Sequence, residues 1–157
     1  MRSIHRSKLP VIEAGCSRRV LLQALGVGAV GAIVLGGCQQ GSSLPGATST
    51  MCGANVCIDL GDAKNAELTM TNGAMAVHIA GDTVAVIRKS ETEIVALSAV
   101  CTHSGCEMDY NASTEQLDCN CHGSVFRLDG SVVAGPARRP VAVYQATLAG
   151  STITIVP

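Results

Sequence analysis

A chain of 157 residues has room for one small domain besides a targeting segment. It has no Trp, one Phe and two Tyr, so its core must be aliphatic, and crosslinks or a bound metal centre would supply much of its stability. The formal charge is −1, and from Gln39 onward six basic residues stand against eleven acidic ones, which excludes a basic nucleic-acid-binding surface. Eight cysteines indicate an oxidising compartment, a metal centre, or both.

Residues 1–37 have the pattern of an export segment. Five of the eleven Lys and Arg residues precede residue 20, and the sequence around Arg18 and Arg19 resembles a twin-arginine signal. The apolar run at 21–35 is interrupted by Gln23 and several glycines, and it is shorter than the about 20 residues of a bilayer span. The alternative interpretation is an uncleaved N-terminal membrane anchor.

Cys38 ends this apolar run, and the sequence LGGC at 35–38 resembles a bacterial lipobox. Cleavage before Cys38 would make it a lipidated N-terminus, whose several acyl chains would hold the protein at the outer side of a bacterial membrane. Residues 39–50 are uncharged and rich in Gly, Ser and Thr, which predicts a flexible tether. We therefore expect a signal segment at 1–37, a lipidated cysteine with a linker at 38–50, and a folded domain at 51–157.

Cys52 and Cys57 form a C-x4-C pair at the start of the predicted domain. In an exported protein this pair favours a small disulfide that fixes the first residues of the domain. A second metal site is the alternative, but no His or further Cys lies nearby in sequence to complete it.

The rest of the sequence predicts an all-β domain. Runs of β-branched residues alternate with Gly-containing turns, and only 109–114 hints at helical periodicity within 51–157. A hairpin turn is expected at Gly81-Asp82, and His78 in the strand before it is expected to face solvent. The predicted strands are 74–80, 83–89, 93–100, 125–128, 131–133, 141–148 and 151–156.

Two short loops hold six sulfur and imidazole groups within 22 residues. Residues 101–106 read CTHSGC and residues 119–124 read CNCHGS. Two thiolates and two imidazoles bind a [2Fe–2S] cluster asymmetrically, with the cysteines on one iron and the histidines on the other. Neutral imidazoles leave the oxidised centre with no formal net charge, and adding an electron to a neutral centre costs less than adding one to a negative centre. The reduction potential of such centres therefore lies at about −150 to +300 mV, against about −400 mV for four-cysteine clusters. A zinc site is the alternative, and it predicts a colourless protein.

The two loops closely resemble the boxes of the Rieske family, C-x-H-x-G-C and C-x-C-H-G-S. The resemblance implies one [2Fe–2S] cluster per chain. Its inner iron would be bound by Cys101 and Cys119, and its outer iron by His103 and His122. It also implies a disulfide that ties the loops together, formed by the two remaining box cysteines, Cys106 and Cys121.

The resemblance covers almost all of 74–157 and implies antiparallel sheets with a small cluster-binding subdomain. The loop Gly135-Pro136-Ala137 matches the proline loop that, with the two boxes, forms the cluster-binding subdomain in that family. Among relatives of high potential, the Ser of the second box donates to a sulfide and a Tyr two residues later donates to a ligand sulfur. Here Ser124 is present and Phe126 replaces the Tyr. We therefore expect a midpoint below that of relatives having both donors and above that of relatives having neither.

The sequence presents no nucleophile or acid–base pair, so we expect a membrane-tethered carrier of single electrons, with a cytochrome or a membrane complex as partner. A Rieske subunit of a quinol-oxidising bc1-type complex is the main alternative, although Ser104 stands where that family often has an apolar docking residue. The small subunit of an arsenite oxidase-type enzyme is a third interpretation, because it too carries a twin-arginine signal. A ferredoxin of a cytosolic dioxygenase fits least, since it lacks the export signal and the extra cysteine pair.

Overall fold

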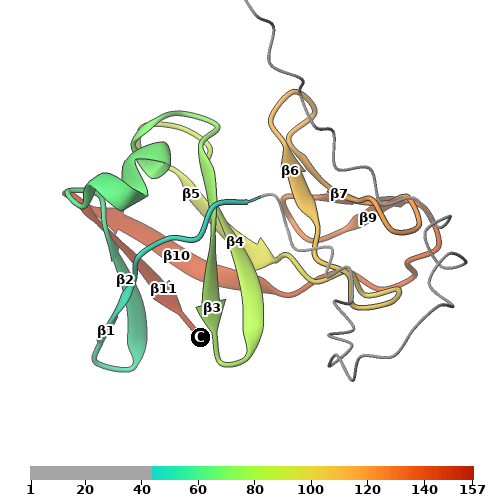
Figure 1. Ribbon diagram of the computed structural model, residues 1–157, viewed down its shortest axis with the longest axis horizontal. Helices are drawn as coiled ribbons and strands as arrows, with labels where there is room; N and C mark the ends of the chain where they lie inside the picture. Colours follow the sequence, from blue (N-terminus) through green and yellow to red (C-terminus); the bar gives the residue numbers. More distant parts are fainter. Residues whose placement is uncertain (1–43) are drawn as a thin grey trace, which may run out of the picture. The chain divides into compact units, whose positions relative to one another are not determined.

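The computed structural model describes residues 44–157. The export segment with Arg18 and Arg19, and the lipobox-like Cys38, lie outside the described residues. Within them the chain forms eleven strands and one short 3₁₀ helix (Figure 1). The elements are β1 (Thr50–Cys52), β2 (Asn55–Asp59), η1 (Ala63–Thr69), β3 (Ala74–Ile79), β4 (Asp82–Arg88), β5 (Ile94–Ser98), β6 (Asp109–Asn111), β7 (Gln116–Cys119), β8 (Ser124–Arg127), β9 (Val132–Ala134), β10 (Val143–Ala149) and β11 (Thr152–Val156).

The strands form two antiparallel sheets. The larger has the order β1-β2-β11-β10-β5-β4-β3, and the smaller has the order β6-β7-β8-β9. The smaller sheet is inserted between β5 and β10 in sequence, and Figure 1 shows it beside the larger one. The predicted all-β class is confirmed, and each strand predicted between 74 and 156 is present within two residues of its expected bounds.

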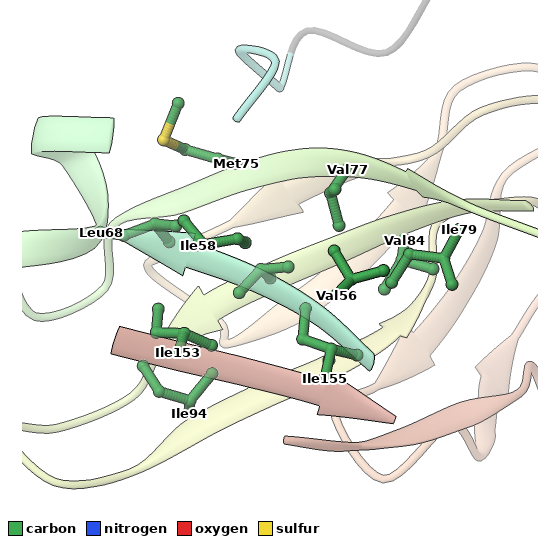
Figure 2. Close-up of a cluster of buried hydrophobic side chains, with 12 residues drawn as sticks. Val56, Ile58, Leu68, Met75, Val77, Ile79, Val84, Ile94, Ile153 and Ile155 are labelled. Atoms are coloured by element: carbon green, nitrogen blue, oxygen red, sulfur yellow. The ribbon is translucent and has the colours of Figure 1, made fainter. Parts of the chain in front are cut away.

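The larger sheet curls around an aliphatic core. Figure 2 shows side chains of β2 and β11 pointing towards those of β3 and β4, although these strands are not all neighbours in the sheet. Alternate residues of β2 and β11 are buried, as the period of a half-buried strand requires, whereas Thr83–Ile87 of β4 are buried on both faces. The best-buried members expose no measurable surface: Ile58, Leu68, Val84, Val86, Ile153 and Ile155.

A second core lies beneath the two cysteine–histidine loops. It contains Leu97 from β5, Met108, Leu117 from β7 and Phe126 from β8, all fully buried, together with the thiols of Cys101 and Cys119. The smaller sheet therefore packs its apolar face against the groups that were predicted to bind metal.

Three local predictions were wrong. Residues 109–111 form β6 and not a helical turn, because they pair with 116–118 of β7. The 3₁₀ helix η1 was not predicted, and it is held by the buried Asn65, whose side chain bonds the backbone of Thr48 and of Asp59. The hairpin turn lies one residue earlier than expected, at Ala80-Gly81, because both residues adopt the positive φ of a type I′ turn.

The linker was also predicted too long. Composition assigned residues 39–50 to a flexible tether, but Pro45 and Ala47 exchange backbone hydrogen bonds with Ala76 of β3. This segment covers the open edge of β3, which removes an unpaired strand edge. His78, in the same strand, is solvent-exposed as predicted. Among residues 44–157 we find no helix long and apolar enough to cross a membrane.

Asp82 joins three strands of the larger sheet near the first loop. Its carboxylate accepts hydrogen bonds from the Tyr144 hydroxyl at 2.7 Å and the Ser98 hydroxyl at 2.9 Å. Ser98 Oγ in turn accepts the backbone N–H of Val100, the residue before the first loop. Burial and the neighbouring Asp82 carboxylate raise the pKa of Tyr144 to about 12.

This raised pKa predicts a loss of stability at alkaline pH. The folded state holds the Tyr144 proton more tightly than the unfolded state, so the contribution is complete below pH 10 and disappears as the pH rises from about 10 to 12. We expect the melting temperature of the wild type to fall more steeply over this interval than that of Tyr144→Phe. Parallel slopes for the two proteins would contradict the assignment.

Candidate metal centre

The two loops have the same backbone design. In the first, residues 101–106, the N–H of Gly105 donates to the carbonyl of Cys101, and in the second, residues 119–124, the N–H of Gly123 donates to the carbonyl of Cys119. Both glycines have positive φ, 73° and 75°, which allows the chain to reverse without a steric penalty. Each loop connects two antiparallel segments, since Val100 pairs with Glu107 across the first and Cys119 pairs with Ser124 across the second. The first cysteine of each loop therefore lies at the end of a strand-like segment, in the core.

The thiols of Cys101 and Cys119 lie at the buried base of the loops, each 2% exposed. Both are free thiols. Burial raises the pKa of the Cys119 thiol, and the Cys101 thiol raises it further. The pair is thus two adjacent sulfur donors in an apolar setting, where metal binding would deprotonate them outright.

His103 and His122 lie at the opposite, exposed end of the loops. Their ring centroids are 5.0 Å apart, with the rings nearly perpendicular at 83°. The Ser104 hydroxyl lies 3.2 Å from Nδ1 of His122, so a residue of the first loop contacts the histidine of the second. The structure therefore brings the two predicted thiol ligands together in the core and the two predicted imidazole ligands together at the surface.

Cys106 and Cys121 form the disulfide that links the loops, with Cα atoms 6.6 Å apart. Three sulfurs, those of Cys106, Cys119 and Cys121, lie within 4.8 Å of one another. Two of them are consumed in the disulfide, so this trio does not supply three thiolates. Cys52 and Cys57 form a second disulfide, which joins β1 to β2 away from the loops.

The disulfide between the loops gives a testable contribution to stability. It closes a segment of 15 residues, worth about 3 kcal/mol through the entropy of the unfolded chain. We expect Cys106→Ser to lower both the melting temperature and the iron content of the purified protein. Cys57→Ser, which opens only the short 5-residue bridge, is the control and should retain its iron. Equal iron content in both variants would show that the linked loops do not depend on their bridge.

The predicted proline loop passes directly over the second box. Gly135 has a φ of 91°, and a Cβ atom there would lie 2.5 Å from Ser124 Cα and 2.7 Å from its nitrogen. The N–H of Ala137 donates to the buried hydroxyl of Ser124 at 3.2 Å. Because that oxygen acts as the acceptor, the hydroxyl hydrogen of Ser124 remains available to a third group. Pro136 lies between these two contacts, exposed beside His103.

Phe126 is fully buried and packs in the same core cluster as Cys101 and Cys119. Its ring has no hydrogen-bond donor. Tyr110 packs against this cluster too, but its buried hydroxyl has no hydrogen-bond partner among residues 44–157. Burial raises the pKa of Tyr110, and the charge of Glu115 adds to the shift.

Sequence reasoning missed three residues beside the site. The Thr102 hydroxyl donates to the carbonyl of Arg139 at 2.7 Å, which ties the first box to the proline loop. Arg138 and Arg139 then line an open hollow of about 640 Å³ next to His103. The sequence feature that could have indicated the two arginines is their position, consecutive and directly after Gly135-Pro136-Ala137.

The donor set fits a [2Fe–2S] cluster. Two adjacent buried thiols and two exposed imidazoles match the asymmetric ligation of such a centre, and the disulfide and the proline loop fix the loops that carry them. Among residues 44–157, the free cysteines are those of this site alone.

Comparisons with known proteins agree with this arrangement. The family model described as Rieske [2Fe-2S] domain matches residues 61–145. An iron-sulfur subunit of the cytochrome b6-f complex from Synechococcus sp. (strain JA-2-3B'a(2-13)) is 35% identical over 150 residues, covering 90% of this chain and 87% of the relative. The same subunit from Gloeobacter violaceus is 37% identical over 79 residues, 49% of this chain, and there the match spans less than half of the relative, 42%.

A solved structure extends the comparison to the fold. The cyanobacterial plasma membrane Rieske protein of Synechocystis PCC 6803 superposes with a TM-score of 0.51 at 24% identity, covering 67% of this chain and 98% of the other. The fold class expected from the two boxes is therefore confirmed.

Proposed function

This chain belongs to the Rieske [2Fe-2S] family of electron-transfer proteins, and from that premise we propose that it is an exported, membrane-tethered carrier of single electrons. The bound [2Fe–2S] cluster supplies one-electron oxidation and reduction. The observation that carries the proposal is the gradient of burial across the site: the sulfur donors lie in the core and the imidazoles reach the surface. This gradient supports an exit for the electron at the exposed, histidine-bearing end of the loops.

We assign the ligands as Cys101 and Cys119 on the inner iron and His103 and His122 on the outer one. The Ser124 hydroxyl would donate its free hydrogen to the cluster, because its oxygen already accepts the N–H of Ala137. The apolar core beneath the thiols excludes water from that side.

Spectroscopy tests this assignment directly. The purified chain should be red-brown and contain about two irons and two acid-labile sulfides. After reduction with dithionite, electron paramagnetic resonance should give a spin-half signal averaging near g of about 1.9, as expected for asymmetric sulfur and nitrogen ligation. A colourless protein that contains zinc, or a fully iron-loaded protein with no signal, would refute the proposal.

The tether is proposed from the N-terminal sequence. Cleavage and lipidation at Cys38 would leave only six residues, 38–43, before the described part of the domain begins at Leu44, and a flexible chain of that length spans roughly 14 Å. The domain would then stay close to the extracytoplasmic face of its membrane. Cys38→Ser should move the protein from the membrane fraction to the soluble fraction, whereas continued membrane association would favour an uncleaved N-terminal anchor.

A second candidate is the iron–sulfur subunit of a quinol-oxidising complex. The observation that favours it is the match to cytochrome b6-f subunits over 87% of one relative's length. Membranes solubilised in mild detergent and purified through a tag on this chain decide between the two. Stoichiometric b-type haem in the product would establish the complex, and its absence would favour the independent carrier.

The midpoint potential gives a test of how this chain tunes its site. Replacing Phe126 with Tyr would place a hydroxyl donor in the core cluster that holds both thiols. A hydrogen bond to a ligand sulfur stabilises the more negative reduced state, so the midpoint should rise. Voltammetry measures it, and Val125→Thr, on the opposite face of β8, is the control. A midpoint that stays constant would remove Phe126 from the tuning residues.

A further inference from the structure

The proline loop presents two arginines beside the exposed histidine of the first box. Arg138 and Arg139 line the hollow of about 640 Å³ together with Thr102 and His103. The hollow includes neither candidate ligand cysteine, so it lies beside the metal centre. The Thr102 hydroxyl fixes the backbone of Arg139 at 2.7 Å, while both arginine side chains remain exposed. We call these two side chains the arginine rim.

The arginine rim brings two positive charges together beside the site, in the part of the chain that the structure describes. In contrast, the sequence from Gln39 onward has eleven acidic and six basic residues. Lys89 is paired with Glu93, and the Arg88 side chain bonds the carbonyls of Leu68 and Glu91. Arg127 contacts the Ser131 hydroxyl. Hydrogen bonds with Ser131 and, to a smaller extent, the charge of Arg127 lower the pKa of the Asp129 carboxyl.

The arginine rim has no such internal partner. Within residues 44–157 neither guanidinium has a carboxylate within ion-pair distance. Acidic residues near the boxes are engaged elsewhere: Glu107 accepts from Thr83, and Asp109 accepts from Asn120. Two adjacent guanidinium groups repel each other, and their planar donors match carboxylates. The surface beside His103 is thus charged, exposed and unsatisfied within the domain.

We propose that the arginine rim docks an acidic surface of a protein redox partner and so brings that partner's redox centre against His103. This inference rests on the proposed electron-carrier function. In each encounter the reduced site gives one electron to an oxidised partner, with no bond made or broken. Opposite charges raise the rate of such transient encounters, and screening by salt weakens them.

Two forms of one probe test the charge preference. Native cytochrome c has a basic surface, and its succinylated form has the same haem with an acidic surface. Stopped-flow mixing of the reduced full chain with each oxidised cytochrome gives the electron-transfer rate constants. With the succinylated form at about 20 mM ionic strength, Arg138→Gln/Arg139→Gln should react about tenfold more slowly than wild type, and the difference should shrink at about 300 mM.

The controls test whether the effect on the rate depends on the position of the positive charge or only on the net charge of the protein. Lys64→Gln, an exposed cation on η1, removes one positive charge away from the boxes and should leave the rate within about twofold. With native cytochrome c the arginine variant should react at least as fast as wild type. Unchanged iron content and an unchanged resonance spectrum will show that the variant keeps its cluster.

Other outcomes distinguish the possible failures. Equal rates of wild type and arginine variant with the succinylated cytochrome would overturn the docking surface while leaving the carrier function intact. Failure of the wild type to reduce either cytochrome would count against the carrier function and, with it, against the docking surface. An arginine-dependent change of the cluster's circular dichroism on adding inorganic phosphate, with equal cytochrome rates, would assign the arginines to a small anion and overturn the proposal.

Discussion

Cys119→Ser is expected to abolish incorporation of the cluster. The thiol is 2% exposed and adjacent to the thiol of Cys101, and a serine hydroxyl does not ionise at neutral pH to replace a thiolate. The purified variant should lack the visible absorption of the wild type and contain less than about a tenth of its iron. Assays of iron and of acid-labile sulfide measure the loss.

The matched control is Cys52→Ser, because it also removes a cysteine sulfur from the domain. Cys52 belongs to the bridge between β1 and β2 and lies outside the core beneath the boxes. This variant should keep its full complement of iron. If Cys119→Ser retained two irons per chain, the inner-iron assignment would have to move to another sulfur.

Gly135→Ala is expected to destabilise the protein and displace the proline loop. A methyl group at this position would collide with the backbone of Gly123 and Ser124, which cannot move as a flexible side chain would. The left-handed φ of 91° adds strain for any residue with a Cβ. Together these effects should cost about 3 kcal/mol or more, measured by chemical unfolding.

Gly81→Ala separates the two causes. Gly81 has nearly the same φ, 88°, but nothing lies within 4 Å of a Cβ built there. This control should lose only about 1 kcal/mol through backbone strain. In Gly135→Ala the Ala137–Ser124 hydrogen bond should also be lost, so the midpoint potential should shift, while it stays constant in Gly81→Ala. Equal losses in the two variants would mean that the proline loop yields without cost.

The sequence by itself predicted the candidate ligand set and most of the strand pattern. The spacing of Cys and His in 101–106 and 119–124 is a local property, since each loop is closed by hydrogen bonds within itself. Runs of β-branched residues between Gly-containing turns likewise predicted most strands, because such residues fit a pleated, buried surface. The two disulfides agree with the expected pairings.

Only the tertiary structure decided what surrounds the site. Residues 45–47 are uncharged linker by composition, but they pair with β3 because the curled sheet leaves that edge open to them. Likewise, no local pattern shows that Gly135 touches Ser124, or that Thr102 holds Arg139 and sets the arginines beside His103. These contacts join segments 11 to 37 residues apart, so they form only when folding brings those segments together.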